Sequence, residues 1–409
     1  MRFTVQRDAF AEAVAWAARA LPTRPVIPVL AGLLLRASGD QLTLACFDYE
    51  VSARVAIPAE VAEAGTALVP GRLLLEITRS LPGQPVRIGD DPDGVVMTCG
   101  DASFTLVTLP PDDYPQLPQL PQLAGTVDGA DLAAAIGQVT PAASKDDTLP
   151  LLTAVNLELA GPVMTLAATD RYRLAVRDLG WVPAEGQPPA TALVPARVLA
   201  DAARMMTAGA PVRIMLREGS GEAGAADGAM IGFEAGERRL TTRLLAGEFP
   251  RFRERFPVVF GCVADLPAEA FAEAVRRVSL VAERGTPVQL TFGGNRVTLV
   301  ASTQGQARAR ESVPARFSGD EPAIAFSPHY LLDGVVAATT GTQPAAGDAP
   351  PADAAEASSE RGDADAAVRI QFTSPSKPAV ITAAAAATAS AGEAPGGFRY
   401  LVVPQRVTQ

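Results

Sequence analysis

The stretch Phe10-Ala11-Glu12-Ala13-Val14 recurs twice along the chain, as Leu132-Ala133-Ala134-Ala135-Ile136 and as Phe271-Ala272-Glu273-Ala274-Val275. Each copy has the apolar spacing of one face of a helix. The copies begin 122 and 139 residues apart, whereas the repeats of a solenoid are only about 20 to 50 residues long. The sequence therefore predicts three copies of a unit the size of a domain.

Further segments follow each predicted helix in the same order. An alternating strand-like stretch comes first, then a strand that leads into a second helix, then a strand containing Val-Arg-Ile. In chain order these segments are 42–48, 66–70 and 85–88, then 164–170, 191–195 and 211–214, then 297–303, 322–326 and 367–370. We therefore predict an α+β fold of three tandem domains, each with two helices on antiparallel sheet. The predicted boundaries are 1–121, 122–260 and 261–409.

Composition places the chain among folded proteins. It has 409 residues, of which 48% are hydrophobic and 20% charged, close to average globular usage. One segment of the third domain differs, a low-complexity acidic insertion over residues 341–366 with six acidic residues against one arginine. Such a composition cannot bury enough apolar surface to fold and is typical of disordered segments.

The sequence also predicts a cytoplasmic protein without a metal site. No apolar run approaches the ~20 residues of a membrane-spanning helix, and charged residues occupy the start where a signal peptide needs apolar ones. The three cysteines, Cys46, Cys99 and Cys262, are widely spaced with no Cys-x-x-Cys pair. We expect buried, reduced thiols and no bound cofactor.

Catalytic motifs are weak. The Gly-x-Gly-x-x-Gly match at 219–224 is not followed by a helical pattern, as a dinucleotide site requires, and prolines interrupt the Ser-x-x-Lys match at 374–377. His329 is the only histidine. It follows Ser327 at a predicted helix start, where that serine is expected to cap the helix. An enzyme alternative stays open, a serine hydrolase using Ser327 or Ser374 with His329.

Four stretches, together with the three copies, resemble the bacterial replicative sliding clamp, the beta subunit of DNA polymerase III. They are 24–35, 104–115, 169–176 and 400–407. The resemblance covers essentially the whole chain. It implies a non-enzymatic, head-to-tail homodimeric ring of six similar domains, which encircles duplex DNA and tethers the replicative polymerase to it.

In such a ring the paired helices face the DNA. The predicted helical segments sum to a charge of +1, against −10 for the whole chain, which favours weak, sequence-independent phosphate contacts. The resemblance assigns Arg24 to DNA contact, and helix position adds Arg72, Arg79, Arg197 and Arg204. For the dimer, it implies that Phe104 packs against the partner subunit's Leu280 and the partner subunit's Val281.

The resemblance also implies a cleft for short Gln-Leu-x-Leu-Phe-like peptides of the polymerase alpha subunit, the clamp loader and other partners. The matching positions are Leu152, Thr169, Arg171, Tyr172, Arg173, Leu174, Pro250, Arg255, Val402, Val403, Pro404, Gln405, Arg406 and Val407. Two positions depart from the family: Gln405 stands where Met or Val is usual, and Glu254-Arg255 replace a segment that commonly holds an aliphatic residue. A specialised duplicate clamp, with an altered cleft that resists a clamp-directed antibiotic, is therefore an alternative.

Overall fold

The computed structural model describes residues 1–206, 210–218, 228–283, 285–303, 306–319, 323–340, 366–384 and 397–406. The predicted insertion, apart from residue 366, and the glycine-rich match at 219–224 lie outside these residues. Within them, one order of elements occurs three times: a strand, a helix, five strands, a second helix and three strands. The predicted threefold α+β organisation is thus confirmed.

Contacts between Cα atoms divide the chain into two units. Unit 1 holds residues 1–130 and 181–246. Its helices are α1 (Arg7–Ala17), α2 (Gly71–Ser80) and α4 (Ala196–Ala203). Its strands are β1 (Arg2–Val5), β2 (Gly32–Ser38), β3 (Gln41–Phe47), β4 (Val51–Pro58), β5 (Glu60–Glu63), β6 (Gly65–Pro70), β7 (Val86–Asp91), β8 (Gly94–Cys99), β9 (Ala102–Leu106), β10 (Gln122–Asp128), β14 (Val182–Pro183), β15 (Ala190–Pro195), β16 (Pro211–Arg217), β17 (Met230–Ala235) and β18 (Arg238–Arg243).

Unit 2 holds residues 131–180 and 247–409. Its helices are α3 (Gly129–Val139, which belongs to this unit from residue 131), α5 (Ala268–Ser279) and α6 (Pro328–Thr339). Its strands are β11 (Ala154–Ala160), β12 (Val163–Thr169), β13 (Arg173–Gly180), β19 (Cys262–Pro267), β20 (Val288–Gly293), β21 (Arg296–Thr303), β22 (Ala307–Pro314), β23 (Arg316–Gly319), β24 (Ala323–Phe326), β25 (Ala367–Phe372), β26 (Ala379–Ala383) and β27 (Phe398–Val402).

Each unit contains one sheet that joins two repeats. In unit 1 the order is β14-β10-β16-β17-β18-β4-β3-β2-β6, and in unit 2 strands β11-β12-β13-β27-β26-β25-β19-β23 are neighbours. The junctions are antiparallel pairings of β18 with β4 and of β13 with β27. The last strand of one repeat therefore pairs with the fourth strand of another at both junctions.

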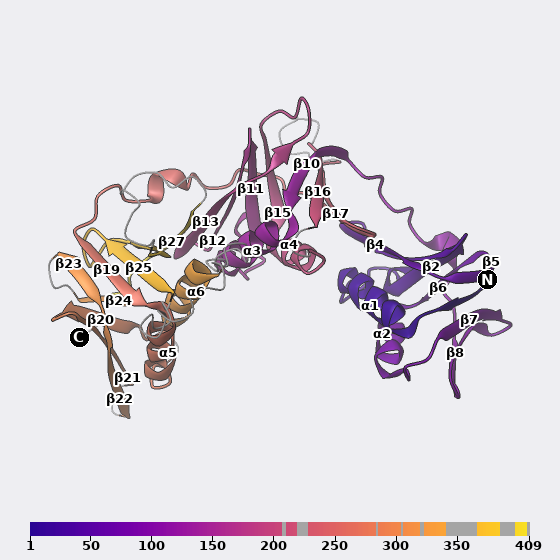
Figure 1. Cartoon of the computed structure of the whole chain (residues 1–409), viewed down its shortest axis with the longest axis horizontal. Helices are drawn as coiled ribbons and strands as arrows, with labels where there is room; N and C mark the ends of the chain where they lie inside the picture. The colour runs from indigo at the N-terminus through magenta and orange to yellow at the C-terminus, as the bar shows by residue number, and fades with distance from the viewer. Residues whose placement is uncertain are drawn as a thin grey trace, which may run out of the picture. The chain divides into compact units, whose positions relative to one another are not determined.

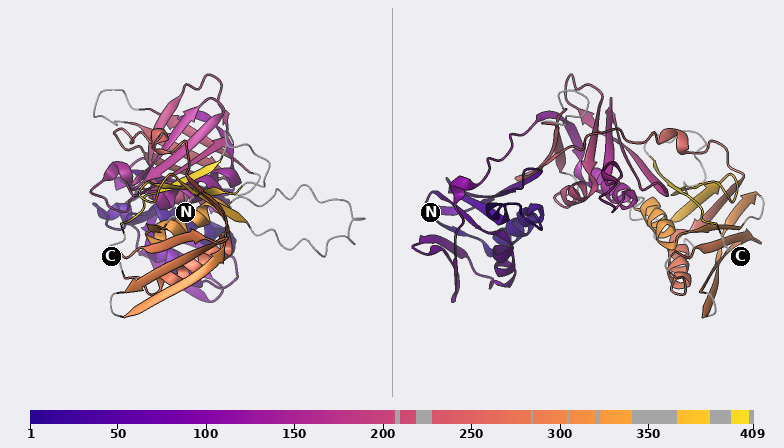
Figure 2. Two further views of the ribbon diagram at one scale, coloured as in Figure 1. Left: turned by 90° about the vertical axis from the view of Figure 1, so that its left-hand side faces the viewer. Right: turned by 180° about the vertical axis from the view of Figure 1, so that it is seen from behind.

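Helices of a repeat lie side by side on one face of the sheet. Contacts join α1 with α2 and α5 with α6 (Figure 1; the right-hand view of Figure 2 shows the same pairs from behind). Their buried faces carry Phe10 and Val14 in α1 and Phe271 and Val275 in α5, the residues of the recurring stretch. All three cysteines are buried, reduced thiols. None of the described helices is long and apolar enough to cross a membrane.

A buried glutamine fixes the end of α6. Gln138 of α3 is 3% exposed, and its Nε2 donates to the carbonyl oxygens of Ala337 and Thr340, both at 2.8 Å. The last carbonyls of a helix have no partner within the helix. Gln138 supplies one and thereby ties α3 to the end of α6.

Gly334 provides the close approach between α6 and β27. A Cβ at this position would lie 2.5 Å from Cδ1 of Tyr400, which is 1% exposed and donates from its hydroxyl to the carbonyl of Tyr330. We expect Gly334→Ala to lower stability by about 1–3 kcal/mol, because overpacking outweighs the better helix propensity of alanine.

Gly137→Ala is the matched control. Gly137 lies in α3 with nothing within 4 Å of its added Cβ, so the substitution should be neutral or stabilise by up to about 1 kcal/mol. Thermal unfolding of both variants measures the difference. Equal melting temperatures would contradict the packing argument.

Candidate functional site

The turn between β12 and β13 is held by its own side chains. Thr169 donates from Oγ1 to the carbonyl of Arg173 at 2.6 Å, and Asp170 accepts through Oδ1 from the backbone N–H groups of Tyr172 and Arg173 at 3.0 and 3.1 Å. These bonds hold Arg171 at φ +80°, a conformation that non-glycine residues adopt at a cost of about 1–2 kcal/mol. The turn therefore presents Arg171 and Tyr172 outward, both exposed.

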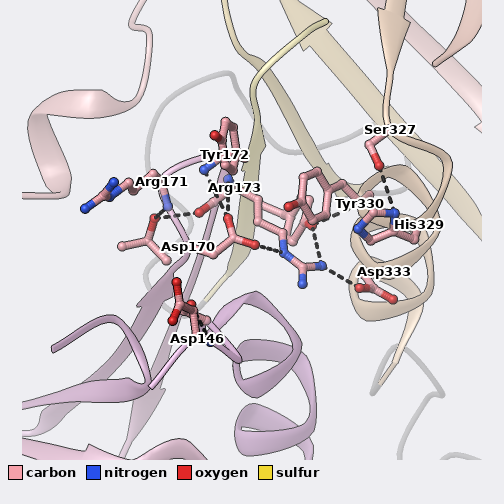
Figure 3. A network of polar contacts seen from close by, with 12 residues as sticks. Asp146, Asp170, Arg171, Tyr172, Arg173, Ser327, His329, Tyr330 and Asp333 are labelled. Atoms are coloured by element: carbon pink, nitrogen blue, oxygen red, sulfur yellow. Dashed lines mark hydrogen bonds and ion pairs between the residues drawn. The ribbon is translucent and has the colours of Figure 1, made fainter. Parts of the chain in front are cut away.

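Arg173 is the centre of a polar network (Figure 3). Its side chain is 7% exposed and pairs with Asp170 at 2.9 Å and with Asp333 of α6. The guanidinium carbon lies 4.4 Å from the centroid of the Tyr330 ring. Removing either carboxylate would leave a buried charge short of a partner, which typically costs several kcal/mol. Arg173 therefore joins the β12–β13 turn to α6.

Tyr400 completes the network from β27. Its hydroxyl lies 3.5 Å from Nη1 of Arg173 and donates to the Tyr330 carbonyl at 2.9 Å. Burial raises the pKa of the Tyr400 phenol well above its ordinary value, so the hydroxyl keeps its proton. In this network the Tyr400 phenol is neutral, whereas the Arg173 guanidinium is charged.

Two tyrosines form the solvent-facing layer above Arg173. The rings of Tyr172 and Tyr330 are nearly parallel, with centroids 6.3 Å apart and an angle of 17° between planes. Tyr172 is 59% exposed. A flat aromatic surface held by a buried ion pair loses little conformational freedom when a ligand binds. We call it the Tyr172–Tyr330 surface.

An apolar cluster adjoins this surface. Its buried members come from strands and from the segment before β19: Ala167, Leu174, Val176, Phe252 and Leu401. Three partly buried hydrophobic residues pack on them, Phe249, Phe256 and Val403. Val403 donates its backbone N–H to the Tyr172 carbonyl, and Gln405 donates its own to the Ala325 carbonyl, both at 2.8 Å. The chain after β27 is thereby fixed between the tyrosine turn and β24.

The predicted cleft residues divide by exposure. Exposed ones are Arg171, Tyr172, Pro250, Arg255, Gln405 and Arg406; partly buried ones are Thr169, Val403 and Pro404; buried ones are Leu152, Arg173, Leu174 and Val402. Val407 lies outside the described residues. Arg173 differs from its exposed neighbours Arg171 and Tyr172, because its side chain is enclosed by its ion pairs and lies against the Tyr330 ring. It is a positioning residue.

Sequence reasoning also missed Asp170, Tyr330, Asp333 and Tyr400 as parts of the site. A signal existed for two of them. Tyr330 and Asp333 are three residues apart just after a predicted helix start, so they share one face of α6. Nothing in the sequence placed that face beside the β12–β13 turn, because Arg173 and Asp333 are 160 residues apart in the chain.

The Ser327–His329 pair exists but serves local structure. Ser327 is the N-cap residue of α6, yet its side chain makes no capping bond, so the predicted cap is wrong. Instead its Oγ lies 2.9 Å from Nδ1 of His329. In a serine triad the hydroxyl contacts Nε2 while an acid holds Nδ1. Ser374 has its Oγ 3.4 Å from that of Ser376.

The predicted DNA-facing arginines are all exposed and all in unit 1. Arg72 and Arg79 lie in α2, Arg197 in α4, and Arg204 directly after it. Arg24 was expected at the end of a helix. Because α1 ends at Ala17 and a 3-10 turn at Ala20, Arg24 lies in the segment that follows, near Pro22, whose carbonyl accepts from Arg72 at 3.1 Å.

The residues predicted to form the dimer interface belong to the first and the third repeat. Phe104 is partly buried on β9, an edge strand in the order β5-β1-β7-β8-β9. Leu280 follows α5 and is 84% exposed, so it stands just beyond the helix rather than in it. The Val281 carbonyl accepts from the Thr303 hydroxyl.

Three repeats of this order, with sheets continued from repeat to repeat, define a chain of tandem DNA-clamp domains. Family models agree: the N-terminal, central and C-terminal domains of the DNA polymerase III beta subunit match residues 1–118, 126–251 and 254–342. The chain belongs to this family, and the function that follows from membership is that of a beta sliding clamp.

Individual relatives support the assignment. The chain is 47% identical to the beta sliding clamp of Streptomyces coelicolor over 100% of both chains. It is 42% identical to the beta sliding clamp homolog GriR of Streptomyces muensis, over 82% of this chain and 88% of the relative. A Pseudomonas aeruginosa sliding clamp bound to griselimycin superposes with a TM-score of 0.82 at 25% identity, over 100% of both chains.

His329 allows a pH test of the network beside it. Partial burial of its ring lowers its pKa, and the Arg173 guanidinium lowers it further, against the opposing effect of Asp333. Because the folded-state pKa lies below the unfolded value near 6.5, acidification favours the unfolded state. Stability should therefore fall as the pH drops from about 7 to 5, by less than about 1 kcal/mol after solvent screening.

His329→Gln should flatten this slope in denaturant titrations at pH 5 and 7. As the only histidine, His329 also gives a single imidazole titration by proton NMR. A folded-state pKa at or above 6.5 would contradict the described environment.

Proposed function

We propose that the chain closes as a head-to-tail homodimer around duplex DNA and tethers the replicative polymerase alpha subunit, the clamp loader and other partners to it. We place the domain boundaries at 121/122 and 260/261, just before the first strand of the second and third repeats. The observation that supports ring closure is the pairing of strands between repeats.

At both internal junctions the ninth strand of one repeat pairs with the fourth strand of another: β18 with β4, and β27 with β13. The remaining strands of these kinds are β9 and β22, and each ends its sheet without a second neighbour among the described residues. Unpaired edges expose backbone donors and acceptors and favour pairing with another chain. If β9 of one subunit pairs with β22 of the other, the same junction closes a ring of six domains.

Phe104→Ala should shift the dimer toward monomer, because aromatic anchors in an interface typically contribute about 2 kcal/mol or more. Sedimentation at micromolar concentration measures the shift, and Phe3→Leu, in the buried core of the same sheet, controls for damage to the domain. A wild-type protein that is monomeric at this concentration would refute the ring.

Topological binding of DNA is the test of the proposed function. With only a few phosphate contacts from Arg24, Arg72, Arg79, Arg197 and Arg204, direct affinity should be low and should fall steeply with salt. A ring loaded on nicked circular duplex should nevertheless stay bound and should be lost after linearisation. Equal retention on both forms would exclude encirclement.

We infer that the Tyr172–Tyr330 surface and its apolar cluster take the partner peptides. An exposed ring, that of Tyr172, and a partly buried one, that of Tyr330, beside an apolar cluster suit an extended apolar peptide. The protein acts by binding rather than by turnover, in the cytoplasm. The specialised-clamp alternative rests on Gln405 and Arg255, both exposed at the margin of this cluster, because their side chains are polar where the family usually has apolar contacts.

Titration of a Gln-Leu-x-Leu-Phe peptide and of griselimycin distinguishes a general clamp from a specialised one. If the departures alter the surface, Gln405→Met combined with Arg255→Leu should strengthen binding about fivefold or more, since one regained aliphatic contact contributes about 1 kcal/mol. Lys377→Leu, an exposed position elsewhere in unit 2, is the control. If the affinities for both ligands stay unchanged, the specialised-clamp hypothesis is rejected and the general clamp remains.

A further inference from the structure

One face of the unit 1 sheet carries a row of charged side chains. Residues directly opposite each other in an antiparallel ladder project to the same face. Arg213 of β16 is opposite Glu234 of β17, Glu234 is opposite Arg239 of β18, and Arg239 is opposite Arg54 of β4. Four neighbouring strands thus place three arginines and one glutamate in line, about 14 Å from end to end.

A second row lies parallel to the first. Arg217 of β16 is opposite Met230 of β17, and Met230 is opposite Arg243 of β18. Arg217 and Arg243 are each four residues from the matching arginine of the first row, an even number, so all five arginines share one face. The rows are separated by about 13 Å. We call these five residues, Arg54, Arg213, Arg217, Arg239 and Arg243, the arginine face.

The space between the rows carries no charged side chain. Met215, Gly232, Thr241 and Ser52 form the middle row, and all are buried. A Cβ on Gly232 would lie 3.5 Å from Leu120, so the Leu120 side chain lies against this row. Leu120 belongs to the segment 115–121, which reads Pro-Gln-Leu-Pro-Gln-Leu-Pro. The segment contains no charged residue and therefore supplies no charge to the arginines.

Charge on this face is incompletely compensated. On β16, β17, β18 and β4, Glu234 is the one acidic residue of this face, and it pairs with Arg213 at 2.6 Å and with Arg239 at 2.5 Å. Asp128 of the adjoining strand β10 projects to the same face opposite Pro211. Arg54, Arg217 and Arg243 are exposed and make no ion pair with any described residue. At the margin, Asp48 accepts from the backbone of its own turn through Oδ1, and Glu50 accepts the Arg243 N–H through its carbonyl.

A positive surface of this kind on a chain of net charge −10 calls for a specific anionic ligand. Guanidinium groups match carboxylates and phosphates equally. Two observations favour a peptide. Leu120 adds a 36% exposed apolar contact between the rows. The positions of this face on β16, β17, β18 and β4 carry no aromatic side chain for bases to stack on, and the nearest rings, Phe47 opposite Ser52 and Tyr49 packed on Phe47, stand only at its margin.

We propose that the arginine face binds an acidic, leucine-containing peptide segment of a partner protein, with leucines against Leu120 and carboxylates on the arginine rows. Within the first row, the Glu234 carboxylate lies between Arg213 and Arg239 and pairs with both. The site is independent of the proposed Tyr172–Tyr330 surface, since its residues all belong to unit 1.

The test uses the full-length protein and a fluorescein-labelled peptide, Glu-Leu-Asp-Glu-Leu-Asp-Glu-Leu-Asp. Arg217→Glu with Arg243→Glu reverses two exposed, unpaired charges without touching Glu234. Arg87→Glu with Arg316→Glu makes the same change in net charge at exposed strand positions on other sheets. Fluorescence anisotropy should show at least a tenfold loss of affinity for the first pair, less than twofold for the second, and weaker binding at higher salt.

Three results would overturn the proposal. The first is equal binding of the matched peptide in which Gln replaces Glu and Asn replaces Asp. The second is an affinity that Arg217→Glu with Arg243→Glu leaves unchanged. The third is displacement of the acidic peptide by a 20-base single strand or duplex at a lower concentration than by unlabelled peptide. The last result would assign the face to nucleic acid. Melting temperatures equal to that of the wild type confirm that all variants are folded.

Discussion

Main-chain pairing between repeats is the constraint on which this protein depends. Strands β18 and β27 each end a repeat, and each finds its partner in another repeat, β4 and β13. Every backbone group at these junctions would otherwise be an exposed edge. A repeat is therefore incomplete by itself, and the same incompleteness at β9 and β22 is what makes a second subunit necessary in the proposed ring.

The network around Arg173 satisfies buried side-chain polar groups, as strand pairing at the junctions satisfies backbone groups. A buried guanidinium is tolerated because Asp170 and Asp333 neutralise it and Tyr330 covers it. Such buried pairs contribute less to stability than to a unique arrangement. Here the arrangement is the angle at which Tyr330 meets Tyr172, so the buried polar contacts determine the shape of the exposed surface.

Charge is distributed by face rather than by domain. The net charge of −10 keeps general affinity for nucleic acid low, while local arginines remain on helices and on one sheet face. A sliding protein needs weak phosphate contacts that break as it moves. The arginine face shows that sheets can hold concentrated positive charge as well, because every second residue of neighbouring strands projects to the same side.

The sequence by itself determined the threefold repeat, the order of helices and strands, and the family, because apolar periodicity and recurring segments are local properties that survive in a linear chain. It also indicated Tyr172, Leu174 and Val403 as neighbours in a site. Only the tertiary structure decided that Arg173 is buried, that Tyr330 and Asp333 belong beside it, and that Arg54 aligns with Arg213. Those contacts join residues far apart in the chain, and their register is set by sheet pairing and helix packing, which no local pattern encodes.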